Sequence, residues 1–199
     1  MRKCIIILLA AVMLLAGCGQ SQSADLPENS GDNSAATHRI VIEIQNYGTI
    51  KAELYGGIAP ITVANFVSLA ESGFYNGLTF HRIIAGFMMQ GGAPSSSSGS
   101  ASTIKGEFSS NGIANDLLHE RGVLSMARTS NPNSASSQFF IMHQTSPHLD
   151  GDYAAFGKVT EGMEVVDAIC MSARPIDSNG SIAKADQPVI RSITVEKIA

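Results

Sequence analysis

The stretch FHRIIAGFMMQGG, from Phe80 to Gly92, contains the residues most able to do chemistry. Within it, Arg82 and Gln90 lie among isoleucine, phenylalanine and methionine residues that otherwise have the composition of a protein core. Arginine is almost never fully buried unless it is paired. Because the guanidinium needs a partner in the fold or a bound molecule, the stretch predicts a site where one fixed cation and one amide face an apolar surface.

The rest of the sequence excludes most other enzyme templates. The five histidines show neither an HExxH motif nor another paired ligand spacing, so we expect no metal site. There is no GxSxG motif for a nucleophilic serine, and no GxxxxGK or GxGxxG motif for phosphate, so we also expect no cofactor. The net charge of -4 argues against nucleic acid as a partner, since its phosphates are bound by clustered lysine and arginine.

Rotation about an X-Pro peptide bond is a reaction that fits one cation, one amide and an apolar groove. The barrier to peptide rotation is about 18 to 20 kcal/mol, and uncatalysed X-Pro exchange takes on the order of tens to hundreds of seconds. Rotation uncouples the nitrogen lone pair from the carbonyl group. A donor directed at that nitrogen therefore stabilises the twisted state more than either planar state, with no need for a nucleophile or a metal.

Four segments carry a resemblance to a known family: FHRIIAGFMMQGG, GVLSMAR, SSQFFI and LDGDYAAFGKV, in this order. From about residue 38 to residue 199 the chain resembles the cyclophilin-type peptidyl-prolyl cis-trans isomerases. The resemblance implies a mainly β fold, a closed eight-stranded antiparallel barrel capped by two α-helices. It also implies a peptidylprolyl isomerase that acts on proline-containing polypeptides and assists protein folding, and we expect a monomer.

The same resemblance assigns the site residues. The catalytic residues are Arg82 and Gln90. The substrate-binding residues are Phe87, Met88, Ala127, Thr129, Gln138, Phe140, His148, Leu149 and Tyr153. Phe87, Met88, Phe140 and Leu149 match the pocket that receives the proline ring. Taken singly, each of these side chains has an ordinary structural interpretation, the apolar ones as core and Arg82 as a salt-bridged arginine.

The sequence departs from the family pattern at several positions. Tyr153 stands where histidine is common, and Ala85 stands where proline is common. The loop APSSSSGSAST, residues 93–103, replaces a segment richer in glycine, which leaves the width of the secondary substrate pocket open. His148 stands where the members most sensitive to cyclosporin have tryptophan, so we expect weak cyclosporin binding.

The periodicity of the chain predicts the elements that position these residues. RIVIEIQ and TIKAELYG alternate on either side of the turn NYG, which indicates an antiparallel hairpin. Apolar residues recur at helical spacing after Pro60 and predict a helix that stops near Gly73, and residues 161–171 predict a second helix. The remaining apolar runs are short, and the absence of a regular βαβ rhythm favours an antiparallel barrel or sandwich.

The N-terminal segment has the pattern of a bacterial lipoprotein leader. Two cations, an apolar run and the ending LAGC place Cys18 where such proteins are acylated. We expect a signal peptide in residues 1–17, the lipidated cysteine and a flexible tether in residues 18–37, and the isomerase domain in residues 38–199. The protein would then be extracytoplasmic and lipid-anchored to a bacterial membrane, whereas a plain secretory leader is the alternative.

Cys170 would be the one cysteine of the folded part, in an apolar run that predicts burial.

A second class of function remains open at this stage. A chaperone-like module could hold proline-containing segments with little turnover. The occurrence of Arg82 together with Phe87, Gln90 and Phe140 favours the enzyme, because a module that only binds proline segments has no need of the arginine.

Overall fold

The computed structural model describes residues 35–94 and 101–198, and every structural statement below concerns these residues. The predicted signal peptide, Cys18, most of the predicted tether and part of the serine-rich loop lie outside them. Among the described residues, neither helix combines the length and the apolar composition needed to cross a membrane.

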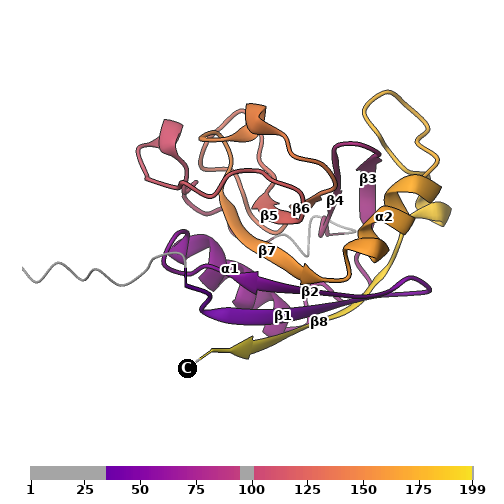
Figure 1. The fold of residues 1–199 in the computed structure, drawn as a ribbon, viewed down its shortest axis with the longest axis horizontal. Coiled ribbons are helices and arrows are strands. Elements are labelled where there is room, and N and C mark those ends of the chain that lie inside the picture. The colour runs from indigo at the N-terminus through magenta and orange to yellow at the C-terminus, as the bar shows by residue number, and fades with distance from the viewer. Residues whose placement is uncertain (1–34, 95–100, 199) are drawn as a thin grey trace, which may run out of the picture. The chain divides into compact units, whose positions relative to one another are not determined.

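Eight antiparallel strands form one curled sheet (Figure 1). The strands are β1 (His38–Ile44), β2 (Gly48–Leu54), β3 (Phe80–Ile84), β4 (Met88–Gly91), β5 (Val123–Met126), β6 (Phe139–Met142), β7 (Ala155–Glu161) and β8 (Ile190–Lys197). Their order across the sheet is β3-β4-β6-β5-β7-β2-β1-β8. The two outer strands are joined at a short seam where they begin: Thr79, just before β3, bridges Val189, just before β8, and the amide of Phe80 donates to the carbonyl of Pro188 at 2.9 Å. The predicted eight-stranded antiparallel fold with two helices is confirmed.

The first hairpin follows from alternation in the sequence. Ile40, Ile42 and Ile44 of β1 are almost completely buried, while the residues between them are at least partly exposed. The strand pairs with β2 in a continuous antiparallel register from His38 opposite Leu54 to Ile44 opposite Gly48. A period of two places every second side chain on the core face, so the hydrophobic pattern fixes this register.

Helix α1 (Pro60–Glu71) starts at the proline, whose fixed φ suits the first helical position. Its buried side chains include Val63, Phe66 and Ala70, which lie on one face. The residue before the helix, Ala59, offers no side-chain cap. Instead, the buried carboxylate of Glu107 accepts the free amides of the first turn, from Ile61 at 3.0 Å and Thr62 at 2.7 Å.

Helix α2 (Met163–Ser172) begins two residues later than the sequence indicated. Glu161 belongs to β7, where it pairs with Lys51, and Gly162 then turns the chain with a φ of 90°. This left-handed conformation favours glycine and separates the strand from the helix. Cys170 on α2 is 2% exposed, as predicted, and burial raises the pKa of its thiol to about 12.

The buried apolar residues form two clusters. The larger cluster fills the interior between the sheet and the helices and includes Phe66, Phe139 and Phe156. The smaller cluster consists of Met88, Val123, Phe140, Met142, Leu149 and Ala155, with Phe87, Ala127 and Tyr153 among the residues packed against it. Most of the proline-pocket residues predicted from the sequence therefore lie in the second cluster, outside the main core.

Candidate active site

Strand register brings the predicted catalytic residues together. Arg82 on β3 lies opposite Gln90 on β4, and Gln90 lies opposite Phe140 on β6. Phe140 in turn lies opposite Ser125 on β5. Because directly paired residues present their side chains on the same face of a sheet, this register lines up a cation, an amide and an aromatic ring across three neighbouring strands.

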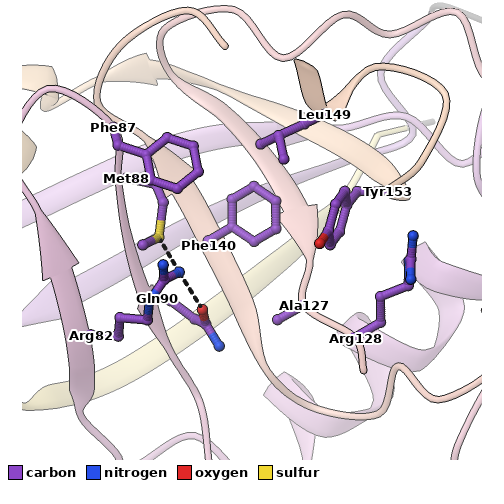
Figure 2. A pocket seen from close by; sticks show the side chains of 9 residues that line it. All are labelled: Arg82, Phe87, Met88, Gln90, Ala127, Arg128, Phe140, Leu149 and Tyr153. Atoms are coloured by element: carbon purple, nitrogen blue, oxygen red, sulfur yellow. Dashed lines mark hydrogen bonds between the residues drawn. The ribbon is translucent and has the colours of Figure 1, made fainter. Parts of the chain in front are cut away.

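These side chains border one pocket of about 150 Å³ (Figure 2). Its lining residues are Arg82, Phe87, Met88, Gln90, Ala127, Arg128, Phe140, Leu149 and Tyr153. In the close view, the ring of Phe140 lies between Met88 on one side and Tyr153 on the other, with Arg82 and Gln90 next to Met88. The pocket thus has an apolar centre with a polar group at its border.

The guanidinium of Arg82 is held from two sides. Its Nε donates to the backbone carbonyl of Asn179 at 2.7 Å, and its Nη1 donates to Oε1 of Gln90 at 3.3 Å. Nη1 also lies 3.8 Å from Sδ of Met88. None of the ion pairs between described residues includes Arg82. The cation is therefore oriented by neutral acceptors, and the salt-bridged structural arginine considered from the sequence is not what the structure shows.

Gln90 occupies a relay position between the arginine and a second amide. Its Oε1 accepts from Arg82, while its Nε2 donates to Oε1 of Gln138 at 3.0 Å. Since an amide has one acceptor end and one donor end, these two bonds fix which way the side chain of Gln90 faces.

The apolar wall is built from aromatic and aliphatic side chains of separate segments. Phe140 is 5% exposed, and its ring meets that of Tyr153 edge to face, with centroids 5.9 Å apart. Leu149 ends the short 3-10 turn Pro147–Leu149 and is also buried. This wall has the size and chemistry to accept a small saturated ring.

Three of the predicted substrate-binding residues lie outside this pocket. Thr129 and Gln138 line an adjoining pocket of about 230 Å³, together with Gln90, Ala127, Arg128, Ser134 and Ser136. Gln90, Ala127 and Arg128 border both spaces, so the two pockets adjoin. His148 is exposed, and its ring centroid lies 5.5 Å from that of Phe87 at the edge of the apolar wall.

Arg128 is a pocket residue that the sequence reasoning missed, although it stands between two residues that were named. Its guanidinium lies 4.6 Å from the ring centroid of Tyr153 and 5.1 Å from that of Phe108. Its Nε donates to the carbonyl of Asp152 at 2.9 Å. Stacking of a cation on Tyr153 fixes the tyrosine and places a positive charge beside both pockets.

The described residues contain no group of three or more His, Cys, Asp or Glu side chains arranged to hold a metal ion. The two pockets are lined by guanidiniums, amides, hydroxyls and the apolar wall. This combination suits binding and polarisation of a peptide.

Comparison with known proteins identifies the chemistry. Residues 39–196 match the family model described as cyclophilin type peptidyl-prolyl cis-trans isomerase/CLD. Peptidyl-prolyl cis-trans isomerase B of Bacillus subtilis is 44% identical over 143 residues, which cover 71% of this chain and 91% of that protein. A peptidyl-prolyl cis-trans isomerase of Acinetobacter baylyi is 49% identical over 132 residues, or 62% of this chain and 68% of that protein.

A solved structure shows the same fold. A cyclophilin-type isomerase of Cryptosporidium parvum, crystallised in the presence of the dipeptide Ala-Pro, superposes with a TM-score of 0.68 at 30% identity. The match covers 80% of this chain and 99% of that one. With the family model, the close relatives and the oriented arginine beside an apolar pocket in agreement, the chain belongs to the cyclophilin-type peptidyl-prolyl cis-trans isomerases.

Proposed function

We propose that Arg82 is the catalytic residue of this isomerase and that Gln90 holds it in place. Nε and Nη1 of Arg82 are engaged by Asn179 and Gln90, whereas no hydrogen bond between described residues uses Nη2. Nη2 of Arg82 can therefore donate a hydrogen bond to a bound substrate. Directed at the nitrogen of a twisted X-Pro bond, it stabilises the lone pair that rotation releases from resonance with the carbonyl.

In this proposal the proline ring occupies the apolar wall of Phe87, Met88, Phe140 and Leu149, and Tyr153 closes one side. Binding the ring there excludes water from the bond that rotates and so strengthens the hydrogen bond from Arg82. Ala127, Thr129 and Gln138 contact the substrate backbone on the side of the adjoining pocket. The Ala-Pro dipeptide used with the Cryptosporidium relative has the chemistry that this wall would accept.

The orientation of Arg82 by neutral acceptors beside the apolar pocket is the observation that carries the proposal. Its test is the isomerisation rate of a short proline peptide, measured for the unaltered protein, Arg82→Ala and Arg82→Lys. We expect Arg82→Ala to fold normally and to lose activity by about a hundredfold or more, because a charge-assisted hydrogen bond is lost in the twisted state. A lysine ammonium cannot bond to both the Asn179 carbonyl and Gln90 and still donate to the substrate in the same geometry. Arg82→Lys should therefore recover little of the isomerase activity.

Full activity in a folded Arg82→Ala protein would disprove this mechanism. Retained binding of the peptide without measurable turnover by the unaltered protein would instead support the chaperone-like alternative.

We further propose that the enzyme is anchored by lipid at Cys18 and acts outside the cytoplasm on proline bonds of proteins as they fold. The support is the order of cations, apolar run, small residues and cysteine in the leader. A single acyl chain gives only marginal membrane binding, so more than one chain is expected on this residue.

Mass spectrometry of the mature N-terminus, together with fractionation of cells that express the unaltered protein or Cys18→Ser, tests the anchor. We expect an acylated Cys18 at the N-terminus and loss of membrane attachment in the variant, with isomerase activity unchanged. An unmodified cysteine, or cleavage elsewhere in the leader, would reject it.

A further inference from the structure

His119 lies directly behind the aromatic wall of the pocket. Its side chain is 1% exposed, and its ring is nearly parallel to that of Phe140, with an interplanar angle of 19° and centroids 6.0 Å apart. The same ring meets Tyr153 edge to face at 6.4 Å. One buried imidazole thus contacts two of the aromatic side chains that line the pocket.

The hydrogen bonds of His119 fix its tautomer. Nδ1 lies 2.9 Å from Oδ1 of Asp150, and Nε2 lies 3.0 Å from Oγ of Ser125. An ionised carboxylate only accepts, so Nδ1 carries the proton and donates to Asp150. In the neutral ring, Nε2 then has a lone pair and accepts from the hydroxyl of Ser125. The neutral ring is satisfied at both nitrogens, as a buried polar group must be.

The same residue supports both ends of the turn that presents Leu149. The backbone amide of His119 donates to Oδ1 of Asp150 at 2.7 Å, and its carbonyl accepts from the amide of Ser146 at 2.8 Å. Ser146 and Asp150 flank the 3-10 turn Pro147–Leu149. The position of Leu149 in the pocket therefore depends on His119 from both sides.

Ser125 on β5 links the imidazole of His119 to the neighbouring strand β6. It is fully buried and is the cross-strand partner of Phe140. The side chain of His119 therefore contacts two pocket residues, Phe140 and Tyr153, and one neighbour of each of two pocket residues: Asp150 follows Leu149 in the chain, and Ser125 lies opposite Phe140.

We propose that His119 and Asp150 form a positioning pair for the isomerase pocket: the neutral imidazole sets where Phe140 and Leu149 lie, and its protonation disturbs both. This inference rests on the proposed role of the pocket in binding the proline ring. It assigns no substrate contact to His119, which acts through the side chains it supports.

The ionisable groups around the ring determine how the pair responds to pH. Burial lowers the pKa of His119 below its ordinary value, while the hydrogen bond and the charge of Asp150 act in the opposite direction and His148 lowers it further. Tyr153 and the imidazole meet edge to face, and the guanidinium of Arg128 stacks on the tyrosine. Burial of the ring thus favours its uncharged form. On protonation Nε2 becomes a donor, so the hydroxyl of Ser125 loses its acceptor within a buried site.

The test is the pH dependence of isomerisation of a proline peptide between pH 5 and 8 for the unaltered protein, His119→Asn and Asp150→Asn. We expect activity of the unaltered protein to fall on the acid side as His119 protonates. Asp150→Asn keeps an acceptor oxygen but removes the charge that favours the imidazolium, so the acid limb should move to lower pH. His119→Asn keeps a donor towards Asp150 but loses the ring and the Ser125 bond, so its acid limb should disappear.

At pH 7.5 we expect His119→Asn to lower kcat/KM by about tenfold, since it removes a stacked aromatic contact and one hydrogen bond. The loss should appear mainly as a higher KM, because the pocket holds the proline ring in the planar and twisted states alike. Loss of Arg82 should appear in kcat instead, so failure of this inference and failure of the proposed role of Arg82 give different results.

Val166→Ala provides the matched control. Val166 is a fully buried residue of α2 in the larger core cluster, so this change lowers stability without touching the pocket. It should keep the kcat/KM and the pH profile of the unaltered protein. An acid limb that is the same in Asp150→Asn and in the unaltered protein would overturn the proposal. So would an equal rise in KM in Val166→Ala at equal loss of stability. The Asp150→Asn profile decides even if His119→Asn folds poorly.

Discussion

Arg82 and Asn179, which are 97 positions apart in the sequence, are joined by a hydrogen bond of 2.7 Å from the guanidinium Nε to the backbone carbonyl. The carbonyl is held in place by its own turn, because the carboxylate of Asp177 accepts the amides of Asn179 at 2.9 Å and Ser181 at 3.0 Å. The Ser181 amide is the largest of the contributions that lower the pKa of Asp177. This loop is itself held against β3, since the backbone amide of Ile83 donates to the carbonyl of Gly180 at 2.8 Å. The arginine is therefore oriented by a loop between α2 and β8.

Replacing Gly180 with alanine should displace this loop and lower activity. Gly180 has a φ of 84°, and a Cβ there would lie 2.9 Å from the carbonyl oxygen of Ile83 and closer still to the side chain of Ile84. The loop must move away from β3, so Arg82 loses its Nε acceptor and we expect kcat to fall by about tenfold. The measurement is kcat for a proline peptide, with the thermal midpoint recorded in parallel.

Gly112→Ala is the control for backbone strain alone. Gly112 has a φ of 77°, but a Cβ there would meet no atom within 4 Å. This variant should lose stability and keep its activity. Equal kcat in the two variants would show that the Asn179 carbonyl does not orient the arginine.

Loss of the Glu107 carboxylate should destabilise the fold without impairing the site. Glu107 is 2% exposed and accepts two amides at the start of α1, which would otherwise be left unpaired. We expect Glu107→Ala to reduce the free energy of unfolding by about 2 to 4 kcal/mol, because charge-assisted bonds to a buried helix end are lost. Urea unfolding measures the change. Glu107→Gln keeps one acceptor oxygen and should cost less, whereas equal losses in the two variants would refute the capping role.

Stability should decline as the pH falls below about 6.5, the ordinary histidine pKa. Burial is the main cause that lowers the pKa of both His81 and His119 in the folded protein. The unfolded chain therefore binds protons first, and between the unfolded and folded pKa values acid favours unfolding. Below the folded pKa values this contribution levels off. Urea midpoints from pH 8 to pH 5 test the trend, and the double change of His81 and His119 to asparagine should flatten it.

Inhibition by cyclosporin should be weak and should increase in His148→Trp. The His148 ring is exposed next to Phe87, and an imidazole offers less apolar surface than the indole of sensitive relatives. The missing packing and hydrogen bond correspond to binding weaker by about ten- to a hundredfold. Inhibition curves for the two proteins, together with turnover of a proline peptide, measure the effect. Potent inhibition of the unaltered protein would show that this position does not set the response.

Much of the fold could be predicted from the sequence because its signals are local. Alternation of isoleucines in β1 marked the first hairpin, and Pro60 marked the start of α1. The start of α2 was wrong by two residues, because pairing of Glu161 with Lys51 extends β7 and this partner lies far away in sequence. Periodicity alone predicted strands and two helices, whereas the number of strands and their closure into a barrel came from the family resemblance. The order of the strands in the sheet was not predicted.

The candidate site also contains residues that could be predicted from the sequence and groups that could not. The resemblance named most of the pocket residues because their side chains recur in short motifs, and the structure brings Arg82, Gln90 and Phe140 together across β3, β4 and β6. The carbonyl of Asn179 has no signature in sequence, since every residue has one. His119 likewise had no signal, because its role depends on stacking against a residue from another strand.

The pairing of β8 with β1 also governs how the protein can assemble. Residues 190–197 pair with β1 along its full length, and the segment just before them joins β3 at the seam of Thr79 and Val189. Until β8 docks, β1 and the start of β3 both present open edges, and open edges are templates for pairing with other chains. A chain still emerging from the ribosome cannot complete this sheet, because the contacts that close it are among the most distant in sequence. This isomerase thus depends, for its own folding, on a late and non-local step, and its open strand edges need protection from aggregation until that step is complete.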